Sequence, residues 1–309
     1  MIYDVIIVGG GPAGISAGIY SARKHLKTLF LAFEIGGQST VSPTIENWIG
    51  LPTISGAELG QKLKAHLESY KGEWLDIKER MKVTEIKKDG EIFFVIDDKG
   101  ITYQSQTVLI TTGSRRRKLS APGSEQFEHK GISYCASCDA PLYSGSDTVA
   151  VIGGGNAGFG TASQLTAYAK KVYIIEQMPN FRAETITVEK LLKNPQVTAL
   201  SNTEILEIKG EKFVSSLVYK DLQMGKITEL PVQGVFVEIG NIPETAFAKG
   251  LVEMNPMGGI IIDPRQQTTS QKGIWAAGDC TDILYHQNNI SAGDGVVAIE
   301  DIYNYLLKK

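Results

Sequence analysis

Three short segments of this chain have residue types and spacings that suit redox chemistry. They are Gly9-x-Gly11-x-x-Gly14, Cys135-Ala136-Ser137-Cys138 and Gly153-x-Gly155-x-x-Gly158. A glycine loop that leads into a helix turns backbone N–H groups and the positive helix end toward a pyrophosphate. Two cysteines at this spacing can close into a small disulfide ring, and the thiolate formed when the ring opens is a nucleophile. Together the segments predict an electron relay from nucleotide to nucleotide to disulfide.

The cysteine pair has a carboxyl beside it, since Asp139 follows Cys138 directly. Such a carboxyl can carry the proton that each redox step requires. The competing interpretation is half of a zinc site, which needs two further ligands. The remaining candidates are Cys280 and four scattered histidines, His25, His66, His129 and His286. None forms a second close pair, so we assign Cys135, Cys138 and Asp139 to catalysis, expect no metal, and interpret Cys280 as a core residue or a bystander near a cofactor.

Each glycine loop lies in the context that a dinucleotide site requires, between a strand and a helix. Around the first loop we expect a buried strand at 3–8, a helix at 15–23 and a second strand at 28–32. The same unit returns as a strand at 148–152, a helix at 161–169 and a strand at 172–175. The chain therefore contains an internal repeat of a nucleotide-binding unit.

An acidic residue about 20 positions after such a loop commonly binds the ribose hydroxyls. Glu34 is the candidate after the first loop, and Glu176, at the end of its strand, is the candidate after the second. A carboxylate at Glu176 would accept from a free 2′-hydroxyl and repel a 2′-phosphate, which favours NADH over NADPH. The alternative is a solvated charge at a strand end.

The remaining segments suggest how the repeat is completed. Residues 81–110 read as a β-meander, and 203–239 is a similar stretch after the second unit. Residues 273–279 read as a strand that runs into an acidic turn, and 291–307 as a final helix. The densest basic run, 115–118, is either a solvated face or a patch for an acidic partner or a nucleotide phosphate.

The bulk properties limit the function classes. The chain has 309 residues, enough for two domains, and a net charge of −3, which argues against nucleic acid as a partner. No apolar run reaches the ~18 residues of a membrane span. The N-terminus shows no charged segment followed by a cleavable apolar stretch, so we expect a cytoplasmic protein.

Taken together, the motifs resemble the low-molecular-weight thioredoxin reductases and the flavoprotein part of alkyl hydroperoxide reductases, over essentially the whole length. The segments that carry the resemblance are 9–14, Gly36-Gly37-Gln38, Glu46-Asn47-Trp48, Thr112-Gly113, 135–139, 153–156 and Ala277-Gly278-Asp279. The resemblance implies an α/β fold of two Rossmann-like, three-layer ββα dinucleotide-binding domains, the second inserted in the first. The FAD-binding domain would comprise residues 1–114 and 242–309, and residues 115–241 would form the pyridine-nucleotide-binding domain that carries the dithiol.

The resemblance also implies site residues. Those for FAD are Gly9, Gly11, Pro12, Ala13, Gly14, Glu34, Gly37, Gln38, Asn47, Val83, Thr112, Gly113, Gly278, Asp279, His286, Gln287 and Asn288. Those for the pyridine nucleotide are Gly153, Gly155, Asn156, Ala157, Gly158, Glu176 and Arg182. By the same likeness Cys138 would face the flavin, Cys135 would attack the partner disulfide, and Asp139 would be the acid and base. The final helix would point its N-terminus, near Ser291 and Ala292, at the flavin, and the protein would be a homodimer.

The sequence departs from the family pattern at several places. NADPH-using relatives carry a His-Arg-Arg-x-x-x-Arg run where this chain reads Glu176 to Arg182, so only the last arginine remains. Gly160 stands near a position where relatives often have Glu, and this bears on how nicotinamide is positioned. The usual Asp-Gly after the second cysteine is Asp139-Ala140, and an Arg-Gln pair at the flavin is His286-Gln287.

These observations predict an FAD-dependent disulfide reductase that passes electrons from NADH through flavin and Cys135–Cys138 to a thioredoxin-like or glutaredoxin-like protein. Two alternatives keep the scaffold: ferredoxin as the electron donor, or oxidation of a small dithiol by oxygen. A third is a redox sensor or metal-binding protein without turnover, which would leave both glycine loops without a role.

Overall fold

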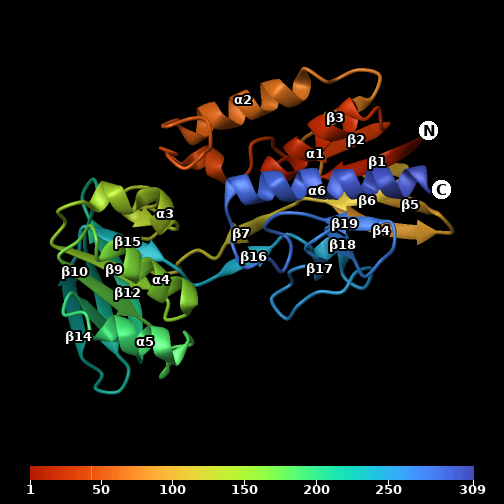
Figure 1. Cartoon of the computed structure of the whole chain (residues 1–309). Helices are drawn as coiled ribbons and strands as arrows, with labels where there is room; N and C mark the ends of the chain where they lie inside the picture. The colour runs from red at the N-terminus through yellow and green to blue at the C-terminus, as the bar shows by residue number, and fades with distance from the viewer. Residues whose placement is uncertain (43) are drawn as a thin grey trace. The chain divides into compact units, whose positions relative to one another are not determined.

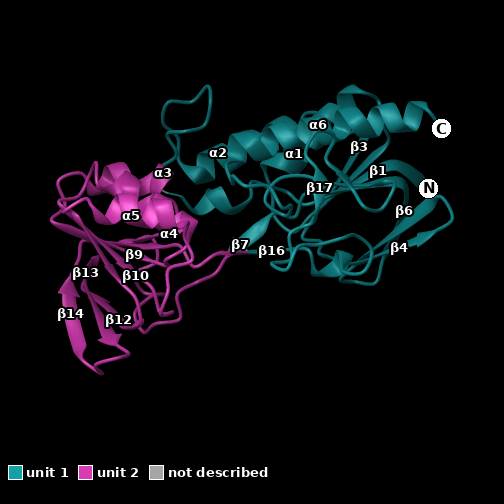
Figure 2. Ribbon diagram, turned by 60° about the horizontal axis from the view of Figure 1, so that its bottom comes forward, with its two compact units in different colours: residues 1–115, 242–309 teal, residues 116–241 magenta. Residues whose placement is uncertain are grey.

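The computed structural model describes residues 1–42 and 44–309. The chain divides into two compact units, Met1–Arg115 with Ile242–Lys309, and Arg116–Asn241 (Figure 2). Each unit contains a parallel sheet with helices, so the predicted α/β class is confirmed. No helix in the described part of the chain has both the length and the apolar character needed to cross a membrane.

The first unit is built on a nine-stranded sheet with the path β17-β18-β19-β6-β1-β2-β3. The strands β19, β6, β1, β2 and β3 run parallel, and β4 and β5 continue from β6 as an antiparallel meander, as predicted for residues 81–110. The bounds are β1 Ile2–Val8, β2 Thr28–Ala32, β3 Leu75–Glu79, β4 Val83–Asp89, β5 Ile92–Asp97, β6 Thr102–Ile110, β17 Ile262–Asp263, β18 Thr268–Thr269 and β19 Ile274–Ala276.

Alternate side chains of β1 enter two different cores, because successive residues of a strand point to opposite faces of the sheet. Val5 and Ile7 pack with the helices, whereas Ile6 and Val8 pack with the meander and the segment that contains Ala248 and Ile260. Helices α1 and α6 lie side by side on the helical face (Figure 1). The helices are α1 Pro12–Arg23, α2 Gly56–Glu68 and α6 Asn288–Leu307, with short 3-10 helices η1 Gln38–Val41 and η3 Ala246–Ala248.

The second unit repeats this plan. Its parallel sheet has the order β11-β10-β9-β15-β8, and β12, β13 and β14 form a separate antiparallel sheet. In β9, Val149 and Val151 join one core while Ala150 and Ile152 join the other. The bounds are β8 Ile132–Ser133, α3 Ala136–Asp139, η2 Ala140–Tyr143, β9 Thr148–Ile152, α4 Asn156–Leu165, β10 Lys171–Ile175, α5 Thr185–Leu192, β11 Val197–Leu200, β12 Thr203–Gly210, β13 Val214–Asp221, β14 Ile227–Pro231 and β15 Gly234–Val237.

The chain passes between the units twice, and the two passages pair with each other. β7 (Ser114–Arg116) and β16 (Asn241–Pro243) form a two-stranded sheet of their own.

Three predicted helix bounds were wrong in the same way. α1 begins at Pro12 rather than at residue 15, α4 spans Asn156–Leu165 rather than 161–169, and α6 begins at Asn288 rather than at 291. In α1 and α4 the helix starts directly after the second glycine of the loop, so the third glycine belongs to the first helical turns. Proline at the first position of α1 fits this start, because its fixed φ suits the helix and its missing N–H costs nothing there.

Candidate functional site

Both glycine loops have the same geometry, and the first and third glycines are required by backbone contacts. Gly9 and Gly153 have φ of +122° and +117°, a region that glycine enters without strain. A Cβ on Gly14 would stand 2.0 Å from the Gly9 carbonyl oxygen, and one on Gly158 would stand 1.8 Å from that of Gly153. Each third glycine therefore lets its helix approach the strand closely.

The second glycine of each loop opens onto space. A Cβ on Gly155 would have no heavy atom within 4 Å, and one on Gly11 would have only the Gly37 Cα at 3.9 Å. Gly11 and Gly155 are also the N-caps of α1 and α4, and no side chain caps either helix. The backbone N–H groups at both helix starts are thus open to a phosphate, which is the fit that a dinucleotide requires.

The residues predicted for FAD gather largely at one edge of the first unit's sheet. The loop after β1, Thr112 and Gly113 after β6, and Gly278 and Asp279 after β19 follow the carboxyl ends of three adjacent parallel strands. Ligands of open α/β sheets bind at this edge. The loop that contains Gly37 lies against the first glycine loop, because a Cβ on Gly37 would stand 3.1 Å from the Gly11 Cα.

Helix α6 brings its first turn to the same edge. A Cβ on Gly295 would stand 2.1 Å from the Ala13 carbonyl oxygen, so α6 and α1 pack closely there. Ser291 Oγ donates to Asp279 Oδ1 at 3.1 Å, and His286 Nδ1 lies 3.4 Å from the same oxygen. Asp279 and His286 are therefore neighbours, as a shared site requires.

Other predicted FAD residues join this cluster through side-chain contacts. Asn47 Nδ2 donates to Gln287 Oε1 at 3.2 Å, and Asn288 Nδ2 donates to Ser39 Oγ at 2.9 Å. Gln38 Nε2 donates to the Ser114 carbonyl oxygen. Glu34 is exposed, and its carbonyl oxygen lies against Gly10, where a Cβ would stand 2.0 Å away. Val83 packs against the core that contains Ile6 and Val8, on the meander side of the sheet.

The cysteine pair forms a disulfide in the second unit, with 5.3 Å between the two Cα atoms. Cys135 is the N-cap of the short helix α3 and Cys138 lies within it. Asp139 closes this turn, donating its N–H to the Cys135 carbonyl oxygen at 3.0 Å. Its Oδ2 accepts from Ser133 Oγ at 2.6 Å, and that hydroxyl also accepts from the Cys135 N–H at 3.2 Å. The three predicted catalytic residues thus form one hydrogen-bonded group.

Cys280 should react with a thiol reagent only after the protein unfolds. It is a core residue, as one of our two interpretations held, and its Sγ lies 3.4 Å from the carbonyl oxygens of both Ile110 and Ala277. Burial raises its pKa to about 12, so the reactive thiolate is scarce near neutral pH. A maleimide titration of the oxidised protein should find no thiol in the native state and one after denaturation. Modification of Cys280 in the native protein would contradict this.

Glu176 follows β10 directly and lies beside the second glycine loop. Its Oε2 accepts from the Gly154 N–H at 2.7 Å, and its Oε1 accepts from the Met178 N–H at 3.0 Å. With 5% of its surface exposed, it is not the solvated charge of our alternative interpretation. A carboxylate has about four lone-pair sites, so two remain for ribose hydroxyls.

The other residues predicted for the pyridine nucleotide surround the start of α4. Asn156 and Ala157 are exposed in its first turn, and Asn156 Oδ1 accepts from the Glu184 N–H at 2.9 Å. Arg182 is exposed, and its Nη2 lies 4.0 Å from Glu176 Oε2. Its guanidinium is therefore drawn to the carboxylate.

The basic run 115–118 does not form a single patch. Arg115 pairs with Glu244 at 2.7 Å, Arg116 donates to the Tyr134 carbonyl oxygen, and Lys118 pairs with Glu128 at 2.7 Å. These different partners favour separate structural roles for the side chains.

Two residues that lie against the predicted site residues were missed by the sequence analysis. Ser133 is 3% exposed and joins Asp139 to Cys135, but a serine two residues before a cysteine gives no pattern to detect. Glu238 follows β15 directly, as Glu176 follows β10. A glutamate directly after each of these two buried strands is the sequence pattern that could have identified Glu238. Burial raises the pKa of Glu238, and the hydroxyl of Thr161 donates to its Oε1 at 2.8 Å.

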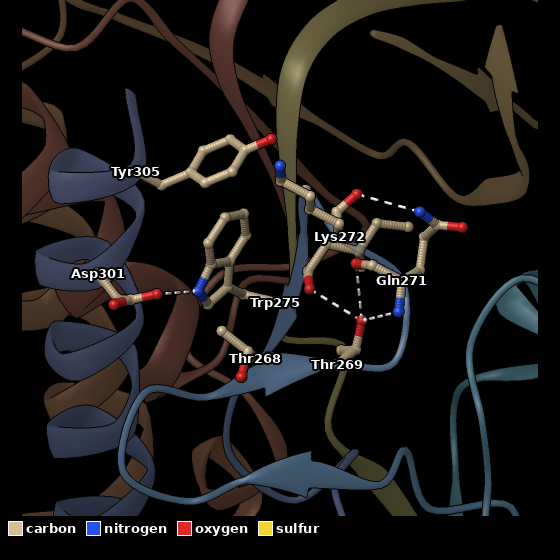
Figure 3. A pocket seen from close by; sticks show the side chains of 9 residues that line it. Thr268, Thr269, Gln271, Lys272, Trp275, Asp301 and Tyr305 are labelled. Atoms are coloured by element: carbon tan, nitrogen blue, oxygen red, sulfur yellow. Dashed lines mark hydrogen bonds between the residues drawn. The ribbon is translucent and has the colours of Figure 1, made fainter. Parts of the chain in front are cut away.

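A pocket of about 140 Å³ in the first unit is lined by none of the predicted site residues. Figure 3 shows Trp275, whose Nε1 donates to Asp301 Oδ2 at 2.9 Å, and Tyr305 with Lys272 beside it. These contacts join α6 to β19, which favours a structural role. Among residues 1–42 and 44–309, no three His, Cys, Asp or Glu side chains form a group able to hold a metal ion.

Comparisons with known proteins agree with this arrangement. The family described as pyridine nucleotide-disulphide oxidoreductase matches residues 3–295. The chain is 39% identical to an NADH dehydrogenase of Bacillus subtilis (strain 168) and 37% identical to an alkyl hydroperoxide reductase component of Escherichia coli (strain K12), each over 99% of this chain. It covers 59% and 58% of those proteins, so it spans about three-fifths of the length of these curated relatives.

Among solved structures, the thioredoxin reductase from Streptococcus pyogenes MGAS5005 superposes with a TM-score of 0.90 at 32% sequence identity. The match covers 100% of this chain and 99% of that one. The likeness of fold therefore extends over both units.

Proposed function

Because this chain belongs to the pyridine nucleotide-disulphide oxidoreductase family, we propose that it is an FAD-dependent disulfide reductase fed by NADH. The observation that carries the proposal is the combination of two open glycine loops of matching geometry with a disulfide. Bound FAD would accept a hydride from the nicotinamide and pass two electrons to the disulfide. The residues described above would bind and orient the two nucleotides and move protons at the disulfide.

We assign FAD to the unit formed by residues 1–115 and 242–309, and the pyridine nucleotide to residues 116–241. The loop at 9–14 and the start of α1 would hold the FAD pyrophosphate, and Asp279 with its partner Ser291 would bind a polar part of the cofactor. The loop at 153–158 would hold the second pyrophosphate, and Glu176 the adenosine ribose.

The dithiol would reduce the partner by two exchange steps. The Cys135 thiolate attacks the partner's disulfide, which forms a mixed disulfide and releases the first partner thiolate. The Cys138 thiolate then attacks the Cys135 sulfur, which restores the disulfide and releases the second. The partner gains two electrons and two protons, and Asp139, held by Ser133, would exchange protons with these sulfurs.

The partner we propose is a thioredoxin-like or glutaredoxin-like protein met in the cytoplasm by a homodimer of this chain. A structural neighbour named thioredoxin reductase supports the class of partner. The reducing cytoplasm suits a disulfide that must open and close in turnover.

The deciding experiment is anaerobic titration of the purified yellow protein with each donor. NADH should bleach the flavin absorbance faster than NADPH or reduced ferredoxin does. Bleaching by reduced ferredoxin alone would show that ferredoxin, not NADH, is the donor. Oxygen uptake with a small dithiol would indicate the oxidase alternative. A protein that remains colourless with added FAD would overturn the proposal.

We expect NADH to exceed NADPH at least about 10-fold in kcat/KM, because a 2′-phosphate would meet the Glu176 carboxylate and like charges repel. The Glu176→Gln variant keeps an oxygen for the Gly154 N–H but loses the charge, so the ratio of kcat/KM with NADH to kcat/KM with NADPH should fall. Glu189→Gln removes the same charge from the exposed side of α5 and should leave the ratio unchanged. Equal use of both donors by the wild type, or an unchanged ratio in Glu176→Gln, would contradict the role of Glu176.

A further inference from the structure

The second glycine loop lies between two carboxyl groups, and only one has a role so far. Gly153 donates its N–H to the Ile175 carbonyl oxygen on the β10 side, next to Glu176. On the β15 side, the Glu238 N–H donates to the Ile152 carbonyl oxygen, and a Cβ on Gly153 would stand 2.3 Å from the Glu238 carbonyl oxygen. Glu176 and Glu238 therefore flank the start of the loop, each at the carboxyl end of its own strand.

The strand order indicates which half of a dinucleotide would lie on each side. From β9 the chain continues to β10 and β11 on one side, and β15 is the neighbour on the other. In sheets of this kind a dinucleotide crosses the point where the strand order reverses, with one half on each side of the first loop. If the adenosine half lies at β10, where Glu176 is, then the nicotinamide half lies at β15.

The Glu238 side chain is fixed and partly shielded from water. Thr161, which is 6% exposed in α4, donates to its Oε1 at 2.8 Å. Next to Thr161, Gly160 adds no side chain, and a Cβ there would have no heavy atom within 4 Å. Burial raises the pKa of Glu238, and the nearby positive charge of Arg116 acts in the opposite direction. A carboxyl held in this way, beside open helix surface, is suited to bind a group that donates hydrogen bonds.

We propose that the Glu238 carboxyl binds the carboxamide of the nicotinamide ring and so positions the ring of the electron donor. The carboxamide carries an NH₂ group that donates, and an ionised carboxyl only accepts, so the two are complementary. Thr161 is a positioning residue, because its hydroxyl holds one carboxyl oxygen and fixes the direction of the other. The inference rests on the proposed function, since it needs a pyridine nucleotide as the donor.

The test compares two ligands that differ at the nicotinamide end. Tetrahydro-NADH retains the carboxamide but does not transfer hydride, and ADP-ribose lacks the ring altogether. Calorimetry on the FAD-loaded protein gives both dissociation constants without turnover. In Glu238→Ala, tetrahydro-NADH should bind about 10- to 100-fold more weakly, the scale of one hydrogen bond to a charged group, and ADP-ribose within about twofold of the wild type.

Two further variants separate binding from folding. Glu238→Gln retains an accepting oxygen and should lose less affinity for tetrahydro-NADH than Glu238→Ala does. Thr161→Val removes the hydroxyl but leaves the carboxyl, and should give a smaller loss that is again confined to tetrahydro-NADH. Similar losses for both ligands would assign Glu238 a structural role and overturn the inference, as would no loss for either. If the wild type binds neither ligand, the nucleotide donor of the proposed function fails as well.

Discussion

Serine in place of both Cys135 and Cys138 will abolish reduction of a protein disulfide and leave the flavin bound. A serine hydroxyl is not ionised near neutral pH and cannot form the disulfide through which the electrons pass. The expected loss is on the order of 10³-fold or more, as when a catalytic nucleophile is removed. The measurements are thioredoxin reduction at saturating NADH and flavin absorbance per chain. In the proposed relay the hydride passes from NADH to the flavin before the disulfide takes part, so we expect NADH to bleach the flavin of the variant as before.

The matched control is Cys280→Ala, which removes the remaining cysteine from the core. It should retain disulfide reduction. The single variant Cys138→Ser adds a test of order, because Cys135 would still attack the partner but could not be released. A mixed disulfide should then accumulate and appear as a heavier band without reductant. Full activity in the double variant would contradict the role of the pair, and accumulation in Cys135→Ser instead would reverse the order.

Alanine at the third glycine of either loop should remove one nucleotide and spare the other. A Cβ at Gly14 or Gly158 would stand 2.0 or 1.8 Å from the backbone oxygen of the first glycine in the same loop, so the loop or the helix start must shift, and we expect this to distort the phosphate site. Gly14→Ala should purify with little FAD. Gly158→Ala should remain yellow, while NADH reduces its flavin at least about 100-fold less efficiently, since misplacing a bound reactant by about 1 Å can cost that much.

Gly160, two residues after Gly158 in α4, offers a control substitution. Gly160 has open space around its Cβ position, so alanine there should fold normally and raise the melting temperature slightly through its better helix propensity. Gly158→Ala should lower the melting temperature instead. If Gly158→Ala retained normal NADH-driven bleaching, the loop at 153–158 would not hold the donor.

The sequence predicted the parts of the fold that depend on local pattern. The strands at 28–32 and 148–152 have the predicted bounds, because each is a short, continuous and largely apolar run. The starts of α1 and α4 were missed because the third glycine was interpreted as part of a turn, whereas it lies inside the helix and lets the helix approach the first glycine of the loop. A contact between Gly158 and Gly153 depends on how the helix packs on the strand, and residue type alone does not reveal it.

The parts of the candidate site that lie within a short sequence motif were predicted. The contacts between residues far apart in the sequence were missed. The disulfide and the second loop follow from short spacings in the sequence. Thr161 and Glu238 are separated by 77 positions and meet only because β15 is inserted next to β9. Side-chain pairs of this kind require the strand order, which one sequence without relatives does not supply.

One hydroxyl has a consequence for the reduced state of the protein. Ser133 bonds to Asp139 on one side of the two cysteines and to the Cys135 backbone on the other, so a polar bridge encloses the same turn as the sulfur bond. This bridge uses no atom of the sulfur bond, so opening that bond does not require the bridge to break. The two thiols then remain at high effective concentration, and little chain entropy is lost when they rejoin. Release of the client protein would therefore be fast, because the resolving thiol is already in place.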